Sequence, residues 1–347
     1  SNPDRALLCV NHEYTSEEVM FPGIGRQDRS DFPNMTQALV DIEMAAHGGS
    51  VVEIEKSGGK WSVIPNSQFN RRITANTPME LTGPAAGDSR MKTNADPSGT
   101  RVSGTINNCA GGVSPWGTYL MAEENFNGYF WNKEAAAASA DAAKFKRYGI
   151  PGQWYAWGQY YDRFDVAKEP NESNRFGWIV EVDPLDPNAT PKKRTALGRF
   201  KHEGCETIVN KDGRIVVYMG DDQRFDYVYK FVSHGRFDPN DRAANMDLLD
   251  SGPLFVAKYE EAGTVCWLPV VIGTGGLTPE NGFNSQADVL IDTRQAADIL
   301  GATPMDRPED VEANPVTNMV YVMLTNNSKR KADQVDFINQ RESNIWG

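Results

Sequence analysis

Short apolar stretches recur along the whole chain, and each is bounded by Gly, Pro, Asn or Asp. This punctuation is typical of β-strands joined by turns. It predicts strands at residues 6–10, 51–55, 61–64, 117–122, 177–182, 214–219, 227–232, 254–259 and 319–324. Helical periodicity is confined to an Ala-rich stretch at 132–148 and to 292–300, where Asp292 or Thr293 would be the N-cap. The pattern therefore predicts an all-β architecture with a few short helices.

A loose internal repeat narrows the choice among β folds. A residue of metal-ligand type is followed by a turn, a strand and a polar pair in the stretches 203–222 and 309–327, and in shorter form in 109–125. Such a repeat suits propeller blades, whose innermost strands begin near a central channel. On these residues alone, coincidence among Gly- and Asp-rich turns is the alternative.

Composition is consistent with one folded domain over residues 1–347. Hydrophobic residues make up 39% and aromatic residues 10% of the 347 residues, which is enough for a sizeable core. No break in composition divides the chain, although the segment 132–172, rich in Trp and Tyr, resembles a long insertion that packs mainly on itself. No apolar run approaches the roughly 20 residues of a membrane helix.

Charge and cysteine content exclude several function classes. Acidic residues outnumber basic ones by 47 to 35, giving a net charge of −12, which disfavours binding to nucleic acids and anionic membranes. Only 4 His and 4 Cys are present, with no C-x-x-C spacing, so a His-rich metal site, a zinc ribbon and a disulfide framework are not expected. Cys9, Cys205 and Cys266 lie in apolar, strand-like contexts and are predicted to be buried.

The residues left to carry chemistry are acids and one thiol. The chain has no G-x-S-x-G elbow, no P-loop and no H-E-x-x-H motif. Cys109 lies between two Asn and a run of small residues, where it could be a thiolate ligand for iron, copper or zinc or simply part of a tight turn. The acid pairs Glu123-Glu124 and Asp221-Asp222 follow predicted strands and suit Ca²⁺, the alternative being solvated turns.

An arginine near the C-terminal end completes this set. Arg307 and Glu309 are two residues apart and lie on the same side of an extended chain. A guanidinium can bind a phosphate or carboxylate through two hydrogen bonds while the neighbouring carboxylate holds a cation. Alone, this motif is a surface ion pair. If Cys109, Glu203 and Asp222 converge on the same channel, it becomes part of a metal-assisted anion site.

Several longer motifs resemble a known family. They are "NHEYT" (11–15), "NNCAGGVSPWGTYLMAEENFNGYF" (107–130), "RFGWIVEVDP" (175–184), "RTALGRFKHEG" (194–204), "VVYMGDD" (216–222), "YVYKFVS" (227–233) and "MDRPEDVEANP" (305–315). In this order, from about residue 6 to residue 347, they closely resemble the PhoX family of bacterial alkaline phosphatases.

The resemblance implies a six-bladed β-propeller with two Fe³⁺ and several Ca²⁺ in its channel, which hydrolyses phosphomonoesters at alkaline pH. It implies that Cys109 and Glu203 bind the iron pair and that Arg307 holds the substrate phosphate. The remaining iron and calcium ligands would come from Asp222, Glu309 and the Glu123-Glu124 pair, with Asp221 as the alternative to Asp222. Family members are exported folded through the twin-arginine route, so a periplasmic or secreted location is expected.

Members of this family are longer than this sequence, with a leading segment and further strands, so the chain is expected to be a fragment with an incomplete propeller. No signal peptide is visible at its start. We expect a monomer that acts on a small phosphomonoester. The alternatives are a calcium-dependent lactonase on a six-bladed propeller, which needs no thiolate, and a propeller that serves only as a binding platform.

Overall fold

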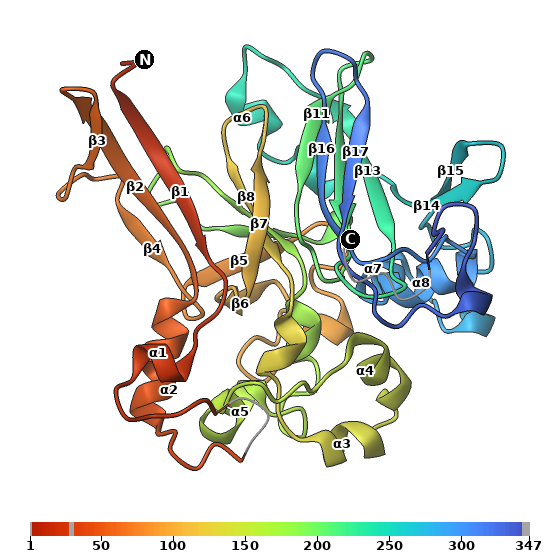
Figure 1. Cartoon of the computed structure of the whole chain (residues 1–347), viewed down its shortest axis with the longest axis horizontal. Coiled ribbons are helices and arrows are strands. Elements are labelled where there is room, and N and C mark those ends of the chain that lie inside the picture. The colour runs from red at the N-terminus through yellow and green to blue at the C-terminus, as the bar shows by residue number, and fades with distance from the viewer. Residues whose placement is uncertain (1, 28–30, 342–347) are drawn as a thin grey trace.

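The computed structural model describes residues 2–27 and 31–341 of the chain, and its strands form four sheets (Figure 1). The first sheet has the order β1-β2-β3, with β4 also paired to β2, and all pairs are antiparallel. Its strands are β1 (Arg5–His12), β2 (Gly48–Ser57), β3 (Lys60–Val63) and β4 (Arg71–Ile73). The register of β1 and β2 sets Asn11 opposite Gly49.

The second sheet has the order β6-β5-β10-β9-β8-β7, in which only the β5–β10 pair is parallel. Its strands are β5 (Pro78–Thr82), β6 (Arg101–Ser103), β7 (Asn108–Val113), β8 (Tyr119–Glu123), β9 (Ile179–Val182) and β10 (Lys192–Arg194).

The third sheet runs in chain order and is antiparallel throughout. Its strands are β11 (Glu206–Val209), β12 (Arg214–Gly220), β13 (Val228–Arg236), β14 (Leu254–Glu260) and β15 (Thr264–Pro269). A fourth, two-stranded antiparallel sheet pairs β16 (Pro308–Ala313) with β17 (Val320–Leu324).

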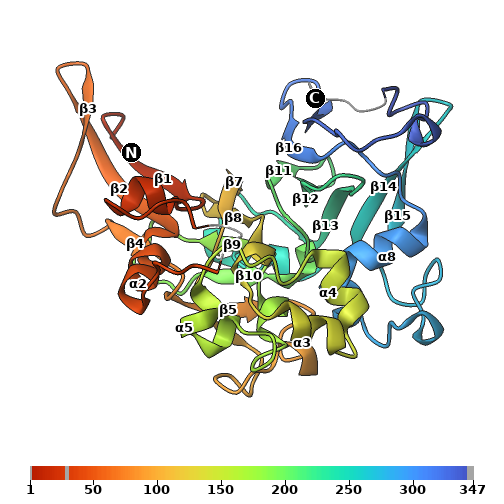
Figure 2. The same ribbon diagram turned by 60° about the horizontal axis from the view of Figure 1, so that its bottom comes forward.

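The helices are short and lie mainly at one end of the sheets, where α1 to α5 gather (Figures 1 and 2). They are α1 (Glu17–Met20), α2 (Gln37–Ala46), α3 (Lys133–Ala138), α4 (Ala142–Tyr148), α5 (Trp157–Tyr160), α6 (Arg242–Asn245), α7 (Gln286–Ile291) and α8 (Thr293–Leu300). Single 3-10 turns occur at η1 (Ser89–Met91), η2 (Phe126–Tyr129), η3 (Asp162–Phe164), η4 (Glu172–Arg175), η5 (Thr195–Leu197), η6 (Leu248–Asp250), η7 (Pro279–Asn281) and η8 (Ala332–Gln334).

The secondary structure confirms the predicted strands and modifies the helices. The Ala-rich stretch forms two helices, because Ser139 adopts an extended conformation after α3. The second helix, α4, ends at Tyr148 and is capped by Gly149 in the left-handed conformation. Asp292 does occupy the N-cap position of α8, but Arg90 holds its carboxylate through two hydrogen bonds of 2.8 and 2.9 Å. The strand content of 30% against 22% helix makes the fold mostly β, with a larger helical share than expected.

Two large hydrophobic clusters and a small third one around Met305 form the core of the described residues. One packs the second sheet against α2 and the helical segment after β8; the other packs the third sheet against α7 and α8. Trp157, from the segment predicted to be an insertion, contacts both Phe164 of that segment and His47 after α2, with ring centroids 5.2 and 4.9 Å apart. The aromatic residues of the segment 132–172 therefore pack on the rest of the protein as well as on one another.

One edge strand of each of the four sheets lies beside an edge strand of the next. β1 contacts β7, β7 contacts β11, and β11 contacts β16. Glycines permit this approach: a Cβ on Gly112 of β7 would lie 1.9 Å from the carbonyl oxygen of Cys205, and one on Gly220 of β12 would lie 2.1 Å from that of Glu309. The described strands form no closed barrel, so a β-rich fold is shown and the six blades stay a prediction.

Of the three cysteines predicted to be buried, Cys205 alone is fully so. Cys205 is fully buried and Cys9 is half-buried, whereas Cys266 is exposed and the prediction of its burial is wrong. Cys266 lies on β15, at the edge of the third sheet in the described chain, where apolar alternation does not guarantee cover on both faces. Among the residues described, no helix is long and apolar enough to cross a membrane.

Candidate metal centre

Cys109 is positioned by an irregularity between β7 and β8. Asn108 pairs with Glu123 and Gly111 pairs with Met121, so β7 has one more residue than its partner in this interval and forms a bulge. The side-chain amide of Asn11 on β1 donates to the carbonyl oxygens of Cys109 and Ala110 at 2.7 and 2.8 Å. The bulge turns the thiol out of the regular strand alternation, and β1 fixes it there.

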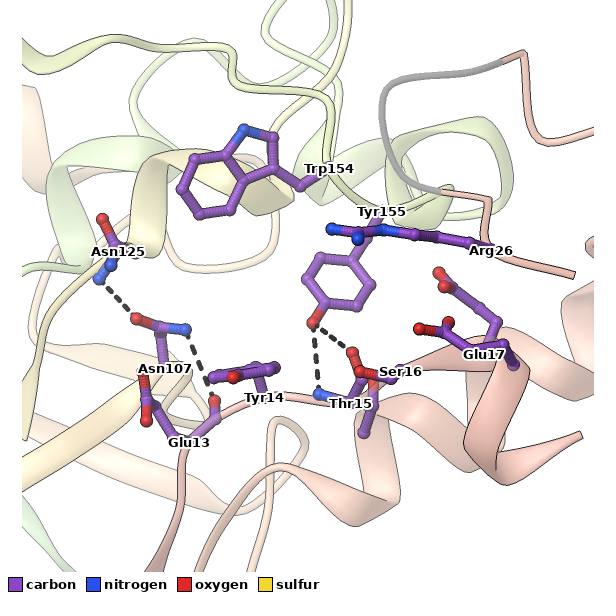
Figure 3. A pocket seen from close by; sticks show the side chains of 11 residues that line it. Glu13, Tyr14, Thr15, Ser16, Glu17, Arg26, Asn107, Asn125, Trp154 and Tyr155 are labelled. Atoms are coloured by element: carbon purple, nitrogen blue, oxygen red, sulfur yellow. Dashed lines mark hydrogen bonds between the residues drawn. The ribbon is translucent and has the colours of Figure 1, made fainter.

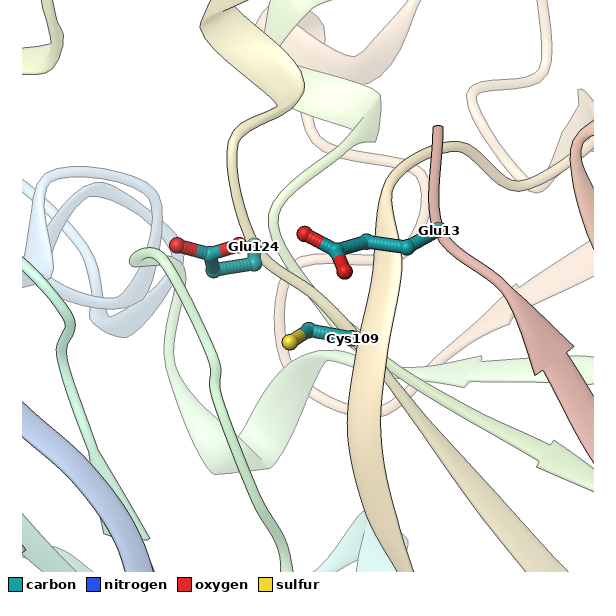
Figure 4. A group of neighbouring side chains, drawn as sticks. All are labelled: Glu13, Cys109 and Glu124. Atoms are coloured by element: carbon teal, nitrogen blue, oxygen red, sulfur yellow. The ribbon is translucent and has the colours of Figure 1, made fainter. Parts of the chain in front are cut away.

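The thiol faces a group of carboxylates. Its Sγ donates to Oε1 of Glu203 across 2.8 Å. Two groups of possible ligand atoms, each within 4.8 Å of one another, meet at Glu124: one adds Glu13 and Cys109 (Figure 4), the other Glu203 and Asp222. Glu124 and Asp222 are buried, and the other three are half-buried. These five residues are called the acidic cluster below.

Arg307 lies beside the acidic cluster. Its Nε and Nη2 donate to the two carboxylate oxygens of Asp222 at 2.8 and 2.6 Å, and Nη2 is 3.3 Å from Oε1 of Glu309. Arg307 has a positive φ of 52°, and the ladder of β16 and β17 shifts register between Pro308 and Val311. This second bulge presents Arg307 and Glu309 together at the start of β16.

The structure does not bring Glu123 and Asp221 into the acidic cluster. Glu123 is fully buried with Lys193, whose Nζ lies 2.7 Å from its Oε1. Asp221 is fully buried against the guanidinium of Arg294, with Nε to Oδ2 at 2.8 Å. Neighbouring residues of an extended chain point to opposite sides, so in each acid pair one member faces the cluster and the other faces an internal cation.

Glu13 is a cluster residue that the sequence reasoning did not select. It follows β1 within the "NHEYT" motif, which was noted for its resemblance and was not assigned a role. It is separated by roughly a hundred residues from Cys109 and Glu124, and the contact between β1 and β7 brings it beside them. Its position in that motif is the one signal in the sequence that could have identified it.

The electrostatics of the acidic cluster are unfavourable for the protein alone. Burial, followed by the charges of Glu203 and Asp222, raises the pKa of Glu124 to about 10. Burial also raises the pKa of Glu203 to about 7, and burial together with Glu203 raises the pKa of the Cys109 thiol. Like charges at this distance oppose each other's ionisation unless a cation is shared among them.

The internal cations do not balance this charge. Lys201 is buried behind the cluster and donates to the amide oxygens of Asn125 and Gln223, at 2.9 Å each. Burial, with the nearby guanidinium of Arg294, lowers its pKa to about 8. Within residues 2–27 and 31–341, Arg307 is the one cation that forms an ion pair with a carboxylate of the acidic cluster, so the possible ligand atoms outnumber the positive charges that contact them.

The donor set fits metal ions. Four carboxylates offer the hard oxygen ligands that Ca²⁺ and Fe³⁺ accept, and a thiolate is a strong ligand for iron. Metal binding would deprotonate these groups and offset the repulsion between their charges. A bound metal would therefore stabilise the ionised forms of the groups whose pKa values are raised in the protein alone. The fold is rich in β-strands, and its acidic cluster offers ligands for metal ions. The guanidinium of Arg307 beside it offers hydrogen-bond donors for an anion. These features define a protein with a candidate metal centre that binds anions.

Comparison with known proteins gives the family. The chain matches the family described as alkaline phosphatase PhoX over residues 1–347 and belongs to that family. It is similar to a solved structure described as Pseudomonas fluorescens PhoX in complex with vanadate, a transition state analogue, with 43% sequence identity and a TM-score of 0.93. That match covers 99% of this chain and 60% of the other, so this chain spans about three fifths of its length. No curated protein sequence matches the chain.

Proposed function

We propose that this chain carries the metal centre and the phosphate site of a metal-dependent alkaline phosphatase that hydrolyses phosphomonoesters. The observation that carries the proposal is the meeting of Cys109 and four carboxylates beside the guanidinium of Arg307. Membership of the PhoX family and the similarity to a protein solved with vanadate support phosphoryl-transfer chemistry.

The metals proposed are two Fe³⁺ and several Ca²⁺. Cys109 and Glu203, 2.8 Å apart, would hold the iron, and Glu13, Glu124 and Asp222 would complete iron and calcium binding. Glu309 is beside them at the start of β16 and is an additional ligand candidate. When bound, the ions neutralise the carboxylates and polarise the P–O bonds of the substrate.

Arg307 is proposed to bind the substrate phosphate. Its Nε and Nη2 now contact both oxygens of Asp222, and the same fork of donors matches two oxygens of a phosphoryl group. A cation bound to Asp222 would free these donors for the phosphate. The guanidinium then both orients the phosphoryl group and stabilises the charge on its equatorial oxygens.

We also propose that the four sheets are blades of a six-bladed propeller. The adjacent edge strands β1, β7, β11 and β16 support a common centre, and the acidic cluster lies near the ends of these strands and of β8 and β12. In this interpretation the segment 132–172 is an insertion between β8 and β9 that carries α3, α4 and α5. The part of the related structure that this chain does not match leaves room for the remaining blades.

The cellular setting follows the family. We propose export through the twin-arginine route to the periplasm or the outside, since that route carries folded, metal-loaded proteins. A monomer is proposed, with a small phosphomonoester as the substrate and no nucleic acid as a binding partner.

The test is replacement of Cys109 by Ala, with Cys266→Ala as the matched control, because Cys266 is exposed on β15 and outside the cluster. Metal content is measured by mass spectrometry, and activity by hydrolysis of p-nitrophenyl phosphate. Loss of iron and of activity in Cys109→Ala alone is expected. Full activity with normal iron would overturn the proposal, and calcium without iron in the unmodified protein would favour a lactonase instead.

A further inference from the structure

Two asparagines lie at the border between the acidic cluster and a neighbouring pocket of about 250 Å³ (Figure 3). Figure 3 shows Tyr14 and Trp154 on opposite sides of this pocket and Asn107 and Asn125 at one end of it. Asn125 is half-buried and directly follows Glu124, which belongs to the acidic cluster. The side chain of Asn125 is therefore close to a proposed metal ligand without being one itself.

The side-chain amide of Asn125 is bound at both of its polar atoms. Its Nδ2 donates to Oε1 of Glu124 at 2.5 Å, and its Oδ1 accepts from Nζ of Lys201 at 2.9 Å. The protonated amino group of a lysine can only donate hydrogen bonds. Lys201, which is buried, therefore keeps Oδ1 on its own side and leaves Nδ2 on the side of Glu124.

The backbone of this segment is held by Asn107. The backbone N–H of Asn125 donates to Oδ1 of Asn107 at 2.5 Å, and that of Glu124 donates to the carbonyl oxygen of Asn107 at 2.9 Å. Asn107 is buried with a φ of 49°, in the left-handed region that asparagine adopts more readily than most residues. Two successive backbone amides are thus fixed by one residue before any metal binds.

A chain of hydrogen bonds with one direction orients Asn107 in turn. Nδ1 of His47 lies 2.7 Å from the carbonyl oxygen of Glu43, which can only accept, so Nδ1 carries the proton. Burial lowers the pKa of His47 to about 4, so the ring is neutral and its Nε2 accepts from the hydroxyl of Tyr129 at 2.8 Å. The hydroxyl oxygen of Tyr129 then accepts from Nδ2 of Asn107 at 3.2 Å. Oδ1 of Asn107 is consequently left facing Asn125.

These contacts leave one oxygen of Glu124 for a metal ion. Oε1 accepts from Asn125, and no donor among residues 2–27 and 31–341 forms a hydrogen bond with Oε2. Hydrogen bonds to a ligating carboxylate fix its orientation, and their loss costs metal affinity even though the ligand itself is still present. The amide of Asn125 is placed to do this for Glu124.

We propose that Asn125 is a positioning residue of the metal centre. It holds the carboxylate of Glu124 in the orientation that binds metal, and Lys201 sets the orientation of its amide. The inference rests on the metal centre proposed above and adds to it two residues that are not metal ligands. Without the amide, metal binding has to fix a carboxylate that is free to rotate, at a cost in conformational entropy.

The experiment compares Asn125→Leu with the control Asn171→Leu. Leucine has nearly the shape of asparagine and removes both polar atoms. Asn171 is also half-buried and its Nδ2 donates to the carbonyl oxygen of Lys92 at 3.0 Å, but it lies outside the acidic cluster. Calcium affinity is measured by equilibrium dialysis, iron content by mass spectrometry, and the free energy of unfolding of the metal-free proteins by urea titration.

We expect the Kd for calcium to rise about 10- to 100-fold in Asn125→Leu, and the iron content to fall. At saturating metal, kcat for p-nitrophenyl phosphate should return to the level of the unmodified protein. Asn171→Leu should bind both metals normally, even where it lowers the free energy of unfolding as much as Asn125→Leu does. Normal metal binding in Asn125→Leu would overturn the inference, and so would a kcat that stays low when the metal sites are filled.

Two variants of Lys201 test its part in the arrangement. Lys201→Met and Lys201→Gln remove the same charge, but the glutamine amide keeps N–H donors for Oδ1 of Asn125. Calcium affinity should therefore be about 3- to 10-fold weaker in Lys201→Met than in Lys201→Gln. In protein that already carries Asn125→Leu, Lys201→Met should add no further loss. Equal affinities in the two Lys201 variants, or additive losses in the double variant, would refute the role given to Lys201.

The outcomes separate this inference from the proposed function. If the unmodified protein is an active phosphatase and Asn125→Leu binds metal as it does, the inference about Asn125 alone fails. If the unmodified protein binds metal but hydrolyses no phosphomonoester, the phosphatase proposal fails, and the calcium and iron measurements still decide the role of Asn125. An unmodified protein that binds neither metal would refute both.

Discussion

Replacing Glu123 by Gln is expected to destabilise the protein and to leave the metal content of the folded molecules unchanged. Glu123 and Glu124 are adjacent at the end of β8, and sequence reasoning treats them as one pair of ligands. In the structure Glu123 is paired with Lys193, whereas Glu124 faces the acidic cluster. The two Gln variants therefore test the orientation of this strand end.

The size of the effect follows from the contacts of Glu123. Its carboxylate accepts hydrogen bonds from Lys193 Nζ at 2.7 Å, from Thr105 Oγ1 at 2.8 Å, and from the backbone N–H groups of Gly177 and Trp178 at 2.9 and 3.1 Å. Both charged side chains are fully buried. Removing one partner of such a pair costs about 3–5 kcal/mol, because the remaining charge stays buried without compensation.

The assay combines urea unfolding with metal analysis of the folded fraction. Glu123→Gln should lower the free energy of unfolding by that amount, and a second change, Lys193→Met, should recover much of it by removing the unpaired cation. Glu124→Gln is the matched control one residue away. It should lose metal and leave the metal-free protein as stable as before or more stable, because it removes a carboxylate whose pKa is raised to about 10 by burial and like charges.

A loss of metal in Glu123→Gln without a change in stability would refute this reasoning. It would mean that Glu123 points into the acidic cluster and that the Lys193 pair is not formed. Equal metal loss in both Gln variants, with equal stability, would have the same meaning.

Three further predictions follow from the same geometry. Arg307→Lys should keep the metals but lower kcat/KM for p-nitrophenyl phosphate about tenfold, since an ammonium cannot reproduce the two-pronged contact; normal kinetics would remove Arg307 from the phosphate site. In chelator-treated protein the free energy of unfolding should fall as the pH rises from about 4.5 to 7, because the pKa of Glu203 is raised to about 7 in the folded protein and the unfolded chain releases this proton at lower pH. Thermal unfolding across this range measures the effect, with added metal as the control, and a flat profile would contradict the reasoning. Gly112→Ala should destabilise the contact between β7 and the start of β11 by more than about 1 kcal/mol, since its Cβ would meet the carbonyl oxygen of Cys205 at 1.9 Å. Gly25→Ala, at a position without a positive φ and with no atom within 4 Å of its Cβ, should cost less; equal effects would contradict the close approach.

Much of the local structure could be predicted from the sequence. Strand positions depend on short-range alternation and on turn residues, and the strands around Val217 and Val256 follow their patterns closely. The break between α3 and α4 was missed, because the run of Ala hides the stop at Ser139. Cys266 was misjudged because apolar neighbours in sequence do not show whether a strand lies at an edge.

The candidate site was only partly predictable. Cys109, Glu203, Asp222 and Arg307 could be selected as chemically suitable residues, and the structure brings them together. Glu13 could not, since a single acid after a strand carries no sign of a contact almost a hundred residues away. The pocket lined by Tyr14 and Trp154 was also beyond reach, because its walls come from distant parts of the chain (Figure 3).

By itself, the sequence determined the β-rich class, the family resemblance and the kind of chemistry, because composition, turns and long motifs are local properties. Tertiary structure alone decided which acid of each pair faces the acidic cluster. Glu123 and Glu124 are the same residue type in the same motif, yet the strand alternation and the position of Lys193 send them to opposite sides. The sequence holds an excess of acid, and the packing of the sheets decides which acids are paired inside and which are left for metal ions.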